Sequence, residues 1–66
     1  MPDNRKRDDI QLNMLVDIVL KKDQPTGILT RGRVMEVLTN KPYHSRGIKV
    51  MLLDGQVGRV QRILED

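Results

Sequence analysis

Residues 47–64, GIKVMLLDGQVGRVQRIL, predict a β-hairpin. Before the Asp54-Gly55 pair, apolar residues alternate with other residues, which is the period of a strand with one buried face. An Asp-Gly pair between two such runs is the strongest short-range signal for a tight hairpin turn. This stretch therefore favours antiparallel β-structure.

Two registers are open for this hairpin. In a two-residue loop, Leu52 pairs with Val57, and one extra residue at Gly58 then brings Val57 and Val60 to the same face. In a three-residue loop, Gly55 occupies a left-handed bulge position and Val57 points outward. We favour the first register because it buries both valines.

The spacing of the second hairpin strand also occurs earlier in the chain. Residues 32–37, GRVMEV, and residues 55–60, GQVGRV, share the pattern G-x-V-x-x-V. Side chains alternate between the two faces of a strand, so valines three positions apart share a face only where the strand bulges or bends. Both segments therefore predict strongly bent strands.

The remaining segments complete an all-β architecture. Residues 14–20 alternate as a strand, DQPTG at 23–27 is a turn sequence, and residues 28–39 read as a strand interrupted by a glycine. Four or five short strands predict a small SH3-like barrel, because closing the sheet buries one face and hides its edges. The expected core is aliphatic and comprises Val16, Ile18, Leu20, Leu29, Val34, Val37, Ile48, Val50, Leu52, Val57 and Val60.

Length and composition limit the 66 residues to one domain, expected over residues 10–66. Residues 1–9 predict a flexible, disordered tail, because six of the nine are charged and only Met1 is a large apolar residue. The longest apolar run is far shorter than the roughly 20 residues of a membrane helix, and no apolar run follows the N-terminal charges as in a signal peptide. We expect a cytoplasmic monomer that does not associate with membranes.

Catalytic chemistry has little basis in this sequence. There is no cysteine, which excludes disulfides and cysteine-based zinc sites. His44 is the single histidine and lies in a polar loop. The glycines at 27 and 32 are not followed by the Lys-Ser/Thr pair that a P-loop requires. We therefore expect no enzyme activity, no catalytic residue, no metal site and no cofactor.

Positive charge is concentrated in residues 28–47, which hold four basic residues and one acidic residue and so account for the net charge of +3. Basic residues around one tyrosine and one histidine suit phosphate contact with base stacking. The same charges also suit a solvated surface, and Tyr43 also suits a lid over one end of the barrel. The candidate nucleic-acid-binding residues are Arg31, Arg33, Lys41, Tyr43, His44 and Arg46, with Lys21, Lys22, Lys49 and Arg59 as secondary contacts.

These candidates predict a non-enzymatic binding module that contacts RNA or a ribonucleoprotein, by shape and backbone more than by sequence. The alternative is a protein-interaction module that pairs with a partner through an exposed edge strand. Salt distinguishes the two, because phosphate binding weakens steeply as salt rises.

The runs VDIVLKKDQPTG at 16–27 and GIKVMLLDGQVGRVQ at 47–61 resemble the YwbE family of small bacterial proteins of unknown function. The resemblance covers about residues 10–63. Asn13 stands where that family usually has glycine, and Ser45 stands where proline is common. The family has no established activity to transfer to this chain.

A more distant resemblance is to the KOW motif of ribosomal and transcription-elongation proteins, which sits on an SH3-like barrel. The spacing between the two glycines is longer here than is usual in that motif, so the likeness concerns barrel geometry. It implies RNA or ribosome contact more than peptide binding. The matching positions are Val16, Ile18, Gly27, Gly32, Val34 and Val37.

Overall fold

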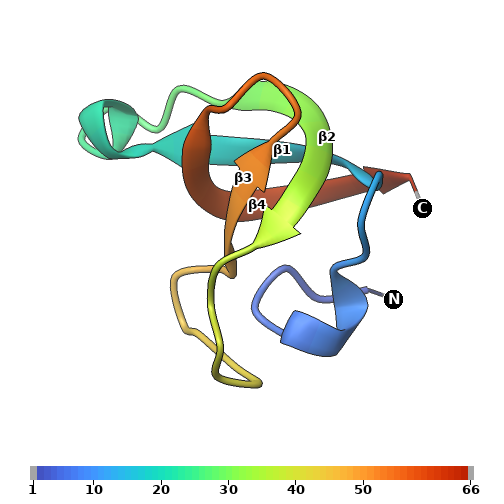
Figure 1. Ribbon diagram of the computed structural model, residues 1–66. Helices are drawn as coiled ribbons and strands as arrows, with labels where there is room; N and C mark the ends of the chain where they lie inside the picture. The colour runs from blue at the N-terminus through green and yellow to red at the C-terminus, as the bar shows by residue number, and fades with distance from the viewer. Residues whose placement is uncertain (1, 66) are drawn as a thin grey trace.

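The computed structural model describes residues 2–65, and the side chains of residues 2–64. Its strands are β1 (Leu15–Leu20), β2 (Thr30–Val37), β3 (Lys49–Leu52) and β4 (Val57–Glu65), with the 3-10 helices η1 (Arg7–Asp9) and η2 (Lys21–Asp23) on either side of β1. They form a closed antiparallel barrel in which β4 pairs back onto β1 (Figure 1). The prediction of a small all-β, SH3-like barrel is confirmed.

Two bent strands close this barrel. β2 pairs with β1 through residues 30–33 and with β3 through residues 34–37, and Met35 is the extra residue at the bend. β4 pairs with β3 through residues 57–59 and with β1 along residues 58–65, with extra residues at Gln61 and Leu64. The two G-x-V-x-x-V segments therefore lie in bent strands as predicted, but the bulges of β4 follow Gly58 rather than coinciding with it.

The hairpin between β3 and β4 adopts the three-residue register. Gly55 has a φ of 89°, and its N–H donates to the carbonyl oxygen of Leu52 at 2.9 Å. Met51 pairs with Val57, and both side chains are only half-buried. The predicted two-residue loop, which placed Val57 in the core, is wrong.

Gly58 explains why this register is stable. It is buried and pairs with Val50 on one side and Leu20 on the other. A Cβ at Gly58 would collide with the carbonyl oxygen of Val19 and lie 2.9 Å from its carbonyl carbon. The missing side chain therefore lets β1 and β4 approach closely at the point where the barrel closes.

The core is aliphatic, as expected, but its membership differs at the margins. Leu29 is 37% exposed because it lies in the loop between η2 and β2 and not in a strand of the barrel. Leu20, Val37 and Ile63 are partly buried and pack against the core. The buried apolar residues are Ile10, Met14, Val16, Ile18, Val34, Ile48, Val50, Leu52 and Val60.

Asp17 is buried although it lies on the outer face of β1, with 4% of its surface exposed. Arg31 on β2 and Arg62 on β4 are its cross-strand partners. Arg31 Nε donates to Asp17 Oδ1 at 3.0 Å, and Arg62 Nε lies 3.9 Å from Oδ2. The hydrogen bond from Arg31 to this carboxylate raises the pKa of the guanidinium above its ordinary value. Two arginines therefore cover one carboxylate on the barrel wall.

Residues 2–9 lie against the loop between β2 and β3 (Figure 1). The N–H of Arg7 donates to the carbonyl oxygen of Pro42, and the N–H of His44 donates to that of Arg5, both at 2.9 Å. The Arg5 guanidinium lies 5.9 Å from the ring centroid of Tyr43. Composition predicts a mobile segment here because the segment has few apolar residues to bury. The contacts that hold it are instead backbone hydrogen bonds and a cation–π pair, which composition does not reveal. The outer ends of the expected tail and domain, Met1 and Asp66, lie outside the described residues.

No helix within residues 2–65 has the length and apolar character needed to cross a membrane.

Candidate nucleic-acid interface

Two adjoining cavities lie on the outside of β1 and β4. Their volumes are about 560 Å³ and 410 Å³. Both are lined by Val19, Gln24 and Arg59, so they form one continuous surface that we call the basic groove. The residues lining the basic groove are Val19, Lys21, Gln24, Gly27, Leu29, Arg46, Lys49, Val57, Gly58, Arg59 and Gln61.

Four cations reach the basic groove from four separate segments. Lys49 and Arg59 are direct cross-strand partners on β3 and β4. Lys21 begins η2 directly after β1, and Arg46 lies in the loop that leads to β3. Arg59 Nη1 donates to the carbonyl oxygen of Gly47 at 3.1 Å, which ties β4 to that loop. Among the side chains of residues 2–64, no carboxylate lines the groove.

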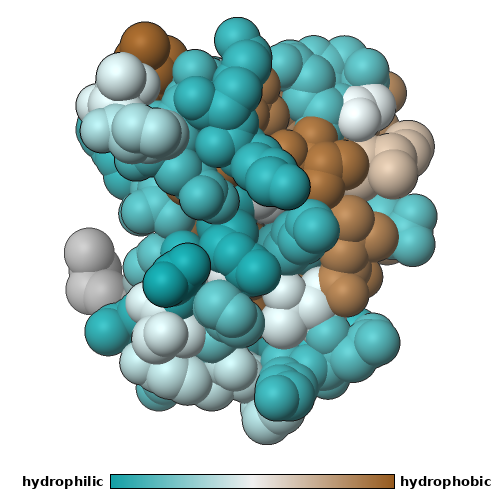
Figure 2. Space-filling model, turned by 90° about the vertical axis from the view of Figure 1, so that its left-hand side faces the viewer, coloured by the Kyte–Doolittle hydropathy of each residue, from teal (hydrophilic) through white to brown (hydrophobic). Residues whose placement is uncertain are grey.

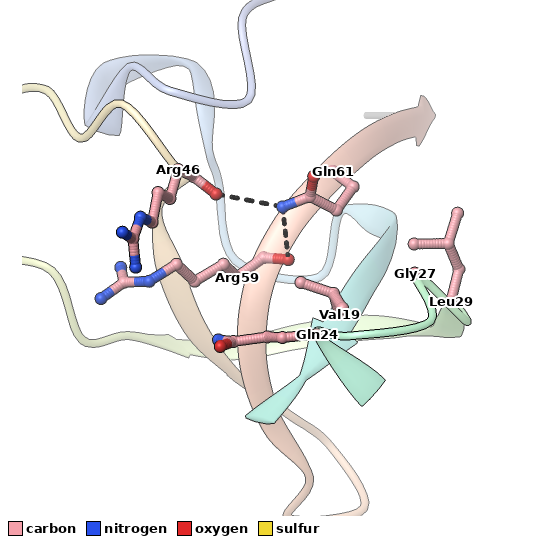
Figure 3. Close-up of a pocket in the computed structure, with 7 residues that line it drawn as sticks. All are labelled: Val19, Gln24, Gly27, Leu29, Arg46, Arg59 and Gln61. Carbon is pink, nitrogen blue, oxygen red and sulfur yellow. Dashed lines mark hydrogen bonds between the residues drawn. The ribbon is translucent and has the colours of Figure 1, made fainter. Parts of the chain in front are cut away.

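The bulge of β4 fixes the position of the Arg46 loop. Gln61 Nε2 donates to the carbonyl oxygens of Arg46 at 3.0 Å and Arg59 at 3.4 Å (Figure 3). The same view shows the side chains of Arg46, Arg59 and Gln24 extending toward one end of the groove, with Leu29 at the other end. The groove therefore has a basic end and an apolar end.

His44 lies at the border of the basic groove and is half-buried. Partial burial lowers the pKa of its imidazole, and the positive charges of Arg59, Arg46 and Lys41 lower that pKa further. His44 Nδ1 accepts the backbone N–H of Arg46 at 3.1 Å. The neutral imidazole fits this site, because a protonated Nδ1 cannot accept that hydrogen bond.

Two predicted contact residues on β2 lie away from the groove. Arg31 is engaged by Asp17, and Arg33 Nη1 donates to the carbonyl oxygen of Asn13 at 2.9 Å. Neither lines either cavity. The charge pattern does not reveal that Arg31 is engaged, because its partner Asp17 lies 14 positions earlier in the sequence.

Three other candidates do not line the groove. Tyr43 is 48% exposed and pairs with Arg5, so it is not a lid over the barrel. Lys22 is exposed, with Nζ 3.9 Å from the Asp23 carboxylate. Lys41 is exposed in the loop before β3. The structure thus brings Lys21, Arg46, Lys49 and Arg59 together, with His44 at their edge, and leaves the other candidates outside.

Neutral residues of the groove carry no signal in the sequence. Gln24, Gln61, Val19 and Leu29 line its walls, yet neither charge nor motif singles them out. Figure 2 shows one face of the molecule, on which hydrophilic side chains predominate and adjoin a band of hydrophobic atoms. Among the described side chains, no three His, Asp or Glu residues are close enough to hold a metal ion.

A family model described as an uncharacterized conserved protein, DUF2196, matches residues 3–63. The uncharacterized protein YwbE of Bacillus subtilis (strain 168) is 52% identical over 60 residues, which cover 91% of this chain and 92% of the relative. No solved structure matches the chain. All residues of the basic groove fall within the matched range.

Proposed function

This chain belongs to the DUF2196 family of uncharacterized conserved proteins, together with YwbE, and for it we propose a non-enzymatic role in binding structured RNA. The basic groove is the proposed contact surface, and the backbone phosphates are its proposed ligands. We further propose that the protein acts as a monomer in the cytoplasm, where structured RNA is abundant.

The pairing of Lys49 with Arg59 is the observation that carries this proposal. Like charges directly opposite each other on neighbouring strands repel and destabilise a sheet. No carboxylate among the described side chains of the groove offsets them. A phosphate between the two side chains would relieve the repulsion and accept charge-assisted hydrogen bonds. The same groove adds Lys21 and Arg46, which suits a ligand with several phosphates in a row.

The shape of the surface favours backbone contact with RNA. Both described helices are three-residue 3-10 turns, so residues 2–65 offer no helix to enter the major groove of DNA. The cations lie along a shallow recess on the curved barrel wall. Structured RNA is commonly recognised through shape and phosphate contacts of this kind.

The alternative function, capture of a partner by an exposed edge strand, receives less support. Each strand between residues 15 and 65 pairs with two others, because β4 pairs back onto β1. β2 pairs with β1 and with β3 along different halves, so the free edges that remain for strand addition are short. We therefore develop the RNA proposal.

An amide chemical-shift titration with a short RNA hairpin tests the proposal. Shifts should concentrate at residues 19–24, 46–49 and 57–61 and should fade as salt rises. The hairpin tip at residues 53–55, which does not line the groove, serves as the internal control. No shifts at submillimolar RNA, or shifts that ignore salt, would contradict phosphate binding.

A further inference from the structure

The larger cavity of the basic groove contains more than a phosphate site requires. Its volume is about 560 Å³, within the range of small-molecule sites. Val19 and Leu29 form apolar walls, and Leu29 remains 37% exposed. A Cβ at Gly27 would meet no atom within 4 Å, so the space beside it is open. A duplex backbone alone has no group that needs such an apolar recess.

Polar groups stand between this apolar end and the cations. Gln61 uses its Nε2 on the carbonyl oxygens of Arg46 and Arg59, which leaves Oε1 as the side-chain atom able to accept from a ligand. Gln24 contributes an exposed amide with both a donor and an acceptor. Apolar wall, amides and guanidiniums therefore follow one another along a single recess (Figure 3).

We propose that this cavity holds one unpaired nucleotide of the bound RNA. Its base lies on Val19 and Leu29, its edge faces Gln24 and Gln61, and the flanking phosphates lie at Arg46 and Arg59. The order of chemistries in the cavity matches the order within a nucleotide, from apolar base face through polar base edge to charged phosphate. A paired base is stacked inside its helix, so the occupant is a base that has left the stack, as in a bulge.

This inference rests on the proposed function and predicts a preference among RNAs with the same stem. Three hairpins are compared with the full chain: an unbulged stem, the same stem with a one-nucleotide bulge, and the same bulge lacking its base. The bulged hairpin should bind about five- to tenfold more tightly than the other two, as expected when one base buries apolar surface against Val19 and Leu29. The methyl signals of Val19 and Leu29 should shift with the bulged hairpin and not with the abasic one.

Neighbouring aliphatic residues supply a matched pair of variants. Leu29 lines the cavity, whereas Ile28 does not, and both are exposed. Leu29→Ala should remove the preference for the bulged hairpin over the unbulged stem. Ile28→Ala should leave both affinities unchanged. The methyl shifts of the unaltered chain give a readout that does not depend on how either variant folds.

The outcomes separate this inference from the function on which it rests. If all three hairpins bind equally in a salt-dependent manner, the base pocket is refuted while phosphate binding stands. If the bulged hairpin binds more tightly but Leu29→Ala keeps that preference, the base lies elsewhere and the inference is again wrong. If no hairpin binds, both proposals fail.

Discussion

Lys21 and Lys22 are adjacent lysines, of which only Lys21 lines the basic groove. Lys21→Gln and Lys22→Gln therefore remove the same charge from neighbouring positions. If the groove is the phosphate-contact surface, Lys21→Gln should change the salt dependence of RNA binding and Lys22→Gln should not. A change common to both variants would reflect net charge alone.

The expected magnitude follows from the four cations of the groove, Lys21, Arg46, Lys49 and Arg59. If each neutralises one phosphate, counterion release gives a slope of about −3.6 for the logarithm of affinity against the logarithm of salt concentration. Affinity should then fall about 150-fold between 50 and 200 mM salt. With three contacts, as in Lys21→Gln, the slope becomes about −2.7 and the fall about 40-fold.

Fluorescence anisotropy of a labelled RNA hairpin at four salt concentrations between 50 and 200 mM measures these slopes directly. The Lys22→Gln protein should reproduce the slope of the unaltered chain. Equal slopes for the two variants, both shallower than that of the unaltered chain, would show that the charges act as a diffuse field. The assignment of Lys21 to a phosphate contact would then be wrong.

Three further predictions concern stability. Gly58→Ala forces a Cβ against the backbone of β1 and should lower Tm by about 5–15 °C in calorimetry. Gly27→Ala is the control: Gly27 has a positive φ but lies in open space, so its substitution should lower Tm by less. Equal losses of Tm in the two variants would refute the close approach of β1 and β4 at Gly58. Asp17→Asn weakens its pairing with Arg31 and should lower Tm by about 5 °C; an unchanged Tm would mean that the arginines cover the site without stabilising it. Because the pKa of His44 is lowered in the folded chain, the unfolded chain binds more protons than the folded chain near this pKa. The free energy of unfolding should therefore fall as pH drops from about 7 to 5. His44→Asn keeps a side-chain acceptor for the N–H of Arg46. In urea unfolding at several pH values, this variant should lose the part of the pH dependence that comes from the imidazole. An unchanged pH dependence would mean that other groups cause it.

The barrel was predictable from alternation, glycine spacing and chain length, whereas the hairpin register was not. An Asp-Gly pair serves both a two-residue turn and a three-residue loop with Gly55 in the bulge position. The choice depends on Gly58, whose inward position brings β1 close to β4. That contact joins residues about 40 positions apart, which local sequence patterns cannot reveal. The wrong prediction that Val57 lies in the core has the same cause.

The basic character of the candidate site was predictable from the sequence, but the set of residues that form it was less so. Counting charges placed the excess in residues 28–47, but Asp17 engages Arg31 across the strands. Three groove cations, Lys21, Lys49 and Arg59, come from outside that segment. The sequence contains these residues, but only the closure of the barrel brings them to one surface.

The pairing of β1 with β4 also constrains how the protein is made. Val16 pairs with Ile63, so the first strand of the barrel gains its second neighbour only after the last strand of the barrel has been synthesised. Such non-local pairing makes folding slow relative to helical domains of similar size. The nascent chain must therefore emerge through β4 before its barrel can close. Until then its aliphatic strands are exposed to chaperones and to other chains.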